Sequence, residues 1–151
     1  MENTATSANI YPIRLVEHKV KDITFKDKEH EKFYQMYLPK CKVQDVYHRA
    51  LIYCLGISAD TRNNVGQIYN FETDSVNPDC LYEGWITSGS AKVVRLALNL
   101  YCNRAISVFH YDKAKEQLDE YKHYTVEDLF CCSYAPYFWE AVRIRYPEYC
   151  N

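Results

Sequence analysis

Residues 85–103, WITSGSAKVVRLALNLYCN, join a stretch of helix-capping residues to an apolar run with helical spacing. The second half is apolar on nearly every side, which predicts a buried α-helix over about residues 88–103. Its polar positions recur every three or four residues and so share one stripe: Ser88, Lys92, Arg95, Asn99 and Asn103. A buried helix with one polar stripe is a natural centre for a small domain. The stripe must meet either water or other polar groups.

Helix-start and helix-stop residues flank this segment at short intervals. The expected starts are Asp27, Val43, Ser58, Asn77, Asp112, Thr125 and Ser133, and the clearest stops are Pro39, Gly56, Gly84 and Pro147. These signals predict a mostly α fold, a compact single-domain bundle of about six to seven helices around the buried central helix. We expect residues 23–151 to form the helical domain. Residues 1–22 are expected to form a flexible or extended arm, with a short strand as the alternative.

Composition limits the classes of function. The chain has 151 residues, enough for one domain, and its net charge of −2 counts against a strongly basic nucleic-acid binder and a highly acidic mimic of DNA. No apolar run approaches the ~20 residues of a membrane span, and the polar residues 1–9 do not resemble a signal peptide. The seven cysteines are odd in number and contain no CxxC pair. We therefore expect a cytoplasmic protein with mostly buried free thiols and no membrane association.

The start of the central helix is a candidate anion site. Free N–H groups at a helix N-terminus, nearby hydroxyls and two cations suit a nucleotide or another anionic small molecule. The residues are Thr87, Ser88, Ser90, Lys92, Arg95 and, further along the stripe, Asn99, with Arg62 as a possible second arginine. The glycine spacing of a P-loop is absent. Ordinary capping and a solvated stripe explain the same residues, and we favour that interpretation.

A second candidate face consists of Asp45, His48 and Arg49, which lie on one side of the expected second helix. Acid–base chemistry or metal binding is one interpretation, but the spacing matches no metal-binding motif. We favour an Asp45–Arg49 ion pair beside a histidine at the edge of the core. The sequence thus identifies no catalytic residue, no metal ligand and no cofactor motif.

Four segments carry a resemblance: FKDKEHEKFY (25–34), VQDVYHRALIYCLGISADTR (43–62), EGWITSGSAKVVRLALNLYCN (83–103) and YTVEDLFCCSYAPYFWEAVRIRYPEYC (124–150). Over about residues 23–150 the chain resembles a family of small uncharacterised proteins, a domain of unknown function. The resemblance associates that family with Gram-positive gut bacteria and their phage and mobile elements. It implies a setting of mobile DNA in a bacterial cytoplasm. It carries over no catalytic or binding residues.

Three functions remain open from the sequence. The favoured one is a non-enzymatic protein-interaction module from a mobile element or phage, with an inhibitor of a host defence nuclease as the specific form. The fifteen tyrosines and two tryptophans fit an interface, although many of the tyrosines fall on expected core faces. The alternative is a binder of an anionic small molecule at Thr87–Arg95. An enzyme that uses His48 ranks third, and nucleic acid is the less favoured partner.

Overall fold

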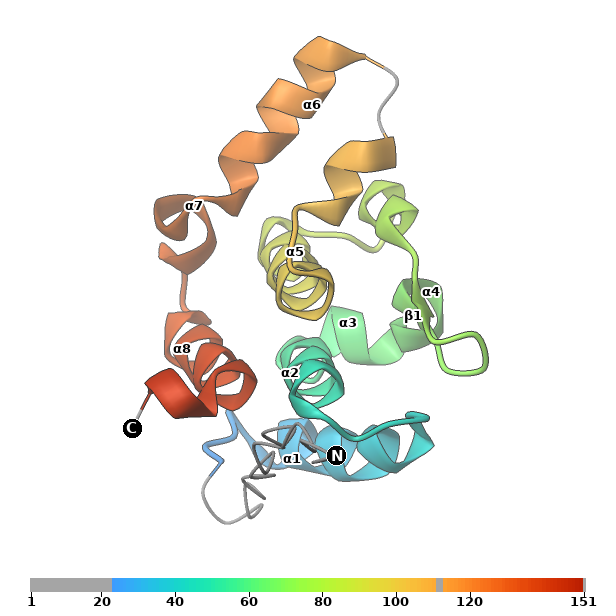
Figure 1. Cartoon of the computed structure of the whole chain (residues 1–151), viewed down its shortest axis with the longest axis vertical. Helices are drawn as coiled ribbons and strands as arrows, with labels where there is room; N and C mark the ends of the chain where they lie inside the picture. The colour runs from blue at the N-terminus through green and yellow to red at the C-terminus, as the bar shows by residue number, and fades with distance from the viewer. Residues whose placement is uncertain (1–22, 111–112, 151) are drawn as a thin grey trace, which may run out of the picture.

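The computed structural model describes residues 23–110 and 113–150 and places the central helix where the sequence predicts it. Helix α5, Ser88–Cys102, runs through the middle of the molecule (Figure 1), with most of its side chains buried. The Thr87 side chain caps its start. Asn103 ends it in a left-handed conformation with φ of 59°, which asparagine tolerates better than most residues.

The core is formed where α5 meets α2, Val46–Leu55, and α8, Ala135–Arg145. Every residue of 50–55 is fully buried because α2 is covered on several sides at once. Phe138, Ala141 and Ile144 face it from α8 at helical spacing. Gly56 ends α2 as expected. A Cβ atom at this position would lie 2.6 Å from the His30 ring, so glycine permits the close approach of the first helix.

Helix α1, Lys28–Tyr37, closes the opposite face of α2 and continues into the turn η2, Leu38–Lys40. The Asp27 carboxylate accepts a hydrogen bond from the His30 N–H at 2.8 Å, so the predicted cap is confirmed. Phe33 and Tyr34 supply the buried apolar stripe.

The segment after α2 differs from the single helix that the sequence predicts from Ser58. It forms two short helices, α3 (Ala59–Asn63) and α4 (Val65–Ile68), because Asn64 leaves the helical conformation between them. A small antiparallel hairpin follows, β1 (Tyr69–Asn70) and β2 (Ser75–Val76), with Tyr69 opposite Val76. Asp74 lies in its turn with φ of 55°. The turn η3, Pro78–Tyr82, then leads to α5.

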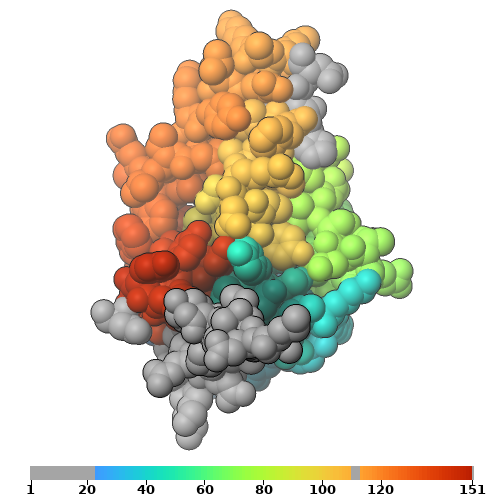
Figure 2. Space-filling model, in the orientation of Figure 1, coloured from blue at the N-terminus to red at the C-terminus, as the bar shows by residue number. Residues whose placement is uncertain are grey.

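The chain after α5 forms an outer arm. It consists of η4 (Ile106–His110), α6 (Ala114–Tyr121), η5 (Lys122–Tyr124) and α7 (Val126–Phe130), and it leads back to α8 and η6 (Pro147–Tyr149). Helix α6 forms the end of the molecule farthest from α1, where it projects as a lobe (Figures 1 and 2).

The predicted mostly α class is confirmed, with eight α-helices and one small hairpin among the described residues. The count exceeds six to seven because the expected third helix is divided. Within 23–110 and 113–150, no helix is long and apolar enough to cross a membrane. The arm expected over residues 1–22 and the cap expected at Asp112 lie outside the described residues.

Candidate functional site

The start of α5 is a closed capping box. The Thr87 hydroxyl accepts the Ser90 N–H at 3.2 Å, and the Ser90 hydroxyl accepts the Thr87 N–H at 2.7 Å. Ser90 is buried, whereas Ser88 is exposed. The Asp60 carboxylate accepts a hydrogen bond from the Thr87 hydroxyl at 3.4 Å. A fixed negative charge therefore already lies at this helix N-terminus, where an anionic ligand would have to bind.

Arg95, one of the two cations of the stripe, is bound to the outer arm. Its Nε and one terminal nitrogen donate to the two Glu120 carboxylate oxygens at 2.8 and 3.1 Å. This two-pronged pair is the strongest geometry available to an arginine and a carboxylate. Ser107 donates to the same carboxylate at 3.1 Å and also hydrogen-bonds Tyr124. Glu120 is the buried residue of α6, so its charge is neutralised inside the protein.

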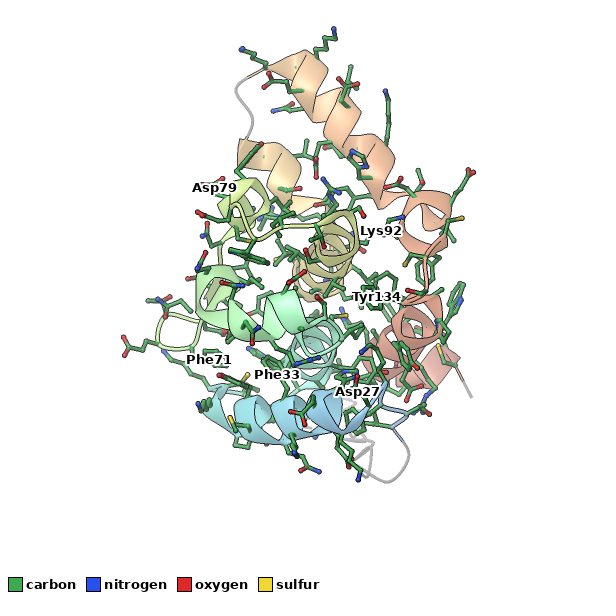
Figure 3. The ribbon with its side chains drawn as sticks, turned by 180° about the vertical axis from the view of Figure 1, so that it is seen from behind. Asp27, Phe33, Phe71, Asp79, Lys92 and Tyr134 are labelled. Carbon is green, nitrogen blue, oxygen red and sulfur yellow. The ribbon has the colours of Figure 1, made fainter. Side chains whose placement is uncertain are left out.

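Lys92 makes the second connection to the outer arm. Its ammonium group donates to the backbone carbonyl of Asp128 in α7, and its side chain lies on the side of α5 that faces α7 (Figure 3). An open hollow of about 460 Å³ lies beside it, lined by Lys92, Lys122, Thr125, Glu127, Asp128 and Cys131. Two carboxylates offset the two ammonium groups in this lining, so the hollow has no strong preference for an anion.

The other predicted members of the anion site lie elsewhere. Arg62 donates to the Gly56 carbonyl at 2.8 Å and thereby caps the end of α2. Asn99 is half-buried further along α5, and its carbonyl accepts the Asn103 N–H at 2.8 Å. The structure therefore directs Arg62, Lys92 and Arg95 to three separate partners rather than to one shared point.

The second candidate face contains a partly buried polar cluster around the buried side chain of His48. His48 lies between two carboxylates: Nδ1 is 2.8 Å from Asp45 and Nε2 is 2.8 Å from Asp74. Tyr101 of α5 donates to Asp74 at 2.6 Å, and Tyr69 of β1 donates to the same oxygen. The cluster joins the start of α2 to the hairpin turn and to the end of α5. Both ring nitrogens are occupied, so His48 has no free nitrogen to accept a proton from a substrate.

Protonation of the cluster follows from its contacts. Burial disfavours a charged imidazole, but the hydrogen bonds to Asp45 and Asp74 outweigh burial and raise the pKa of His48. Burial likewise favours the neutral acid at Asp74, yet the hydrogen bonds from Tyr101, Tyr69 and His48 lower its pKa to about 2. The contacts therefore favour the protonated imidazole of His48 and the ionised carboxylates of Asp45 and Asp74.

The sequence placed Asp45, His48 and Arg49 on one face of the helix. It did not show that Asp74 and Tyr101 join His48 in a hydrogen-bonded cluster. Asp45 pairs with His48 and not with Arg49, and no ion pair of Arg49 is found among the described residues. Asp74 and Tyr101 are 26 and 53 residues away from His48. The only local signal was the polar turn before β2, which does not indicate its partner.

The histidine of α1 is a neutral structural group. His30 is fully buried, its Nε2–H donates to the Tyr53 carbonyl at 2.7 Å, and its Nδ1 accepts the Lys26 N–H at 3.1 Å. Burial lowers the pKa of His30 to about 4. No group of three or more histidine, cysteine or acidic side chains in the described parts of the chain is arranged to hold a metal ion.

The seven cysteines are all free thiols, but only three of them are buried. Cys41, Cys54 and Cys80 are buried, whereas Cys131 and Cys150 are exposed, and the remaining two are half-buried. Burial raises the pKa of Cys41 to about 11 and that of Cys80 to about 12. The buried thiols therefore stay protonated and unreactive at neutral pH.

Exposed apolar side chains lie on three consecutive α-helices that follow one side of the molecule. We call this side the α6–α8 edge and define it by Leu118, Tyr121, Val126 and Trp139, which lie on α6, α7 and α8. These three helices succeed one another along one side (Figure 1). The Trp139 ring, although 56% of the residue is exposed, is held against Phe130 with centroids 4.3 Å apart. Sequence reasoning did not identify this edge, because the same residues fit a buried stripe equally well.

Comparison with known proteins gives a family without an assigned activity. No curated protein and no solved structure matches the chain. A family of unknown function, DUF6075, matches residues 20–151. This range contains the central helix, the His48 cluster and the α6–α8 edge. The chain therefore belongs to the DUF6075 family of unknown function.

Proposed function

We propose that this protein is a non-enzymatic protein-interaction module whose contact surface is the α6–α8 edge. The supporting observation is the exposure of Leu118 and Val126, at 66% and 64%, on an arm that the core holds in place. Exposed apolar residues that gather on one side of a small domain are typical of a binding surface. Trp139 supplies a rigid aromatic anchor of the kind that is enriched in such interfaces.

The polar stripe of α5 holds the helices of the α6–α8 edge in position. Lys92 and Arg95 fasten α7 and α6 to the central helix, so they help to shape the edge. A contact surface whose parts are fixed before binding loses less entropy on association. The module therefore needs no chemistry of its own, only a preformed apolar edge.

The biological setting is part of the proposal. We propose that the protein comes from a phage or mobile element of a Gram-positive gut bacterium and binds a host protein in the cytoplasm. A defence nuclease is the specific target that we propose, because an inhibitor acts by occupying a surface and requires no catalytic group. The sequence resemblance supports the setting, and the exposed edge supports the mode of action.

The test is site-specific photo-cross-linking from the edge. A photoreactive residue replaces Val126 or Trp139, and the matched control replaces Glu29, an exposed residue of α1. We expect one host protein to be cross-linked from the edge positions only. We also expect the double variant Val126→Asp/Trp139→Ser to lose that protein from a pull-down.

Two results would contradict the proposal. Equal cross-linking from Glu29 would show that the edge is not the contact surface. Retention of the same host protein by the double variant would also show that the edge is not the contact surface. A nucleotide or phosphate compound retained by the wild-type protein and lost from Lys92→Ala would favour an anion-binding function instead.

A further inference from the structure

Helix α6 carries an apolar stripe that none of the residues described in 23–110 and 113–150 covers. Ala114, Leu118 and Tyr121 are spaced by four and three residues, so they share one side of the helix. All three are exposed, whereas the position that faces the core is Glu120. At about 100° per residue, the stripe lies well to the side of Glu120. The projecting lobe in Figure 2 leaves this helix accessible.

The stripe is complementary to itself when two copies run in opposite directions. Reversal about the Gln117–Leu118 step places the small Ala114 of one copy opposite the large Tyr121 of the other. The Leu118 side chains of the two copies then meet near the symmetry axis. A two-fold contact of this kind uses the same patch on both molecules, as most homodimers do.

The charges beside the stripe select the same arrangement. Lys115 and Asp119 are one turn apart on the flank that faces away from the core, and both are exposed. Two-fold symmetry brings the same flank of both copies together, so Lys115 of each copy lies opposite Asp119 of the other. A parallel two-fold pairing would place this flank of one copy beside the opposite flank of the other, so Lys115 would not meet Asp119. The apolar pairing is centred between Gln117 and Leu118, and the charged pairing is centred at Gln117. Two independent features of the helix therefore favour the same antiparallel arrangement.

From this pattern we propose that the occupant of the α6 stripe is a second copy of this chain, bound as an antiparallel two-fold pair of α6 helices. The inference rests on the proposed function, because it assigns the α6 part of the α6–α8 edge to self-association. Val126 and Trp139 remain available to another protein. The paired surface of two short helices is smaller than the ~1,200 Å² of a standard interface, so the dimer is weak and reversible.

Sedimentation velocity of the full chain over concentrations from about 10 μM to about 1 mM tests the proposal. We expect the wild-type mass to rise toward that of a dimer with concentration. Leu118→Asp should weaken association by more than about tenfold, because it removes the central apolar contact. The exposed control Lys28→Asp on α1 should associate like the wild type.

Charge reversal gives the sharper test. K115D and D119K should each be monomeric, because each single variant sets like charges opposite one another. An equimolar mixture of the two single variants should associate again, as should the double variant K115D/D119K. Only a contact between two copies of α6 predicts this rescue. Rescue by mixing also shows that the single variants are folded.

Distinct results separate the possible failures. A wild-type protein that stays monomeric up to about 1 mM overturns the second-copy assignment, while a host protein cross-linked from Trp139 would leave the proposed function standing. A dimer that tolerates all three single variants places self-association elsewhere and equally overturns the assignment. A host protein cross-linked from Leu118, in the absence of dimers, assigns the stripe to that protein instead.

Discussion

Arg145 carries its positive charge into the interior at the point where α5 ends. Its Nε donates to the Leu100 carbonyl and a terminal nitrogen donates to the Asn103 side chain, both at 2.9 Å. The guanidinium plane lies over the Tyr47 ring, 3.6 Å from its centroid. A cation is favourable at a helix C-terminus and over an aromatic face. Arg145 thus links α8, α5 and α2 through one side chain.

At the residue scale we predict that Arg145→Ala lowers the free energy of unfolding by about 2–4 kcal/mol, because it removes buried hydrogen bonds and packing together. Arg145→Lys should recover only part of the loss, since an ammonium group cannot stack and donate in a fork at once. Urea unfolding measures both changes. The exposed Arg104→Ala is the matched control, and an equal loss in that variant would contradict the special role of Arg145.

At the element scale, the orientation of α6 depends on a polar contact and not on an apolar face. The residue that α6 buries is Glu120, and it is held by Arg95 and Ser107. Breaking a buried ion pair is costly because one charge remains without its partner. The arm should therefore loosen when Glu120 is removed, while the α2–α5–α8 core should not.

We predict that Glu120→Ala increases hydrogen exchange of the amides in residues 114–121 and leaves residues 50–55 protected. The double variant Arg95→Met/Glu120→Leu should restore much of the protection, because an apolar pair of similar volume replaces the ion pair without an orphaned charge. Hydrogen-exchange mass spectrometry compares the two regions in one experiment. Unchanged exchange in α6 of Glu120→Ala would show that other contacts hold the arm.

The elements were more predictable than their contacts, for a local reason. Caps act within a few residues, so Asp27, Thr87 and Thr125 marked three helix starts that the structure confirms. The break at Asn64 was missed because helical spacing continues across it in the sequence. Spacing also shows which residues share a side of a helix but not whether that side is covered, so the uncovered stripe of α6 could not be identified from the sequence.

At the scale of the whole molecule, contacts between distant segments decide which polar residues are free. Arg95 and Glu120 are 25 residues apart, and Arg145 and Leu100 are 45 residues apart. No periodicity links such pairs, so the sequence could identify a polar stripe on α5 without showing what it meets. The same limit applies to His48. Its second carboxylate partner is Asp74, which lies in a turn whose position relative to His48 cannot be predicted from the sequence.

Two histidines make stability depend on pH in opposite directions. His48 has a raised pKa, so its contribution is fully present below the ordinary value of 6.5 and is lost as the pH rises through its folded pKa. His30 has a pKa lowered to about 4. Between 6.5 and about 4 the unfolded chain takes up a proton that folded His30 does not, so falling pH destabilises the fold. Maximal stability should therefore lie near pH 6.5.

We predict that each histidine controls one side of this maximum. His48→Gln should flatten the alkaline side and His30→Gln the acid side, each by at most about 1.4 kcal/mol per pH unit for one proton. Urea unfolding from about pH 4.5 to about pH 7.5 measures the curves, about one unit below the pKa of an exposed cysteine thiol. NMR titration of the wild-type rings provides a check that needs no variant, with His30 expected to titrate near 4 and His48 above 6.5. If both rings titrated near 6.5, neither the cluster around His48 nor the burial of His30 would govern stability, and the two sides of the curve would need another cause.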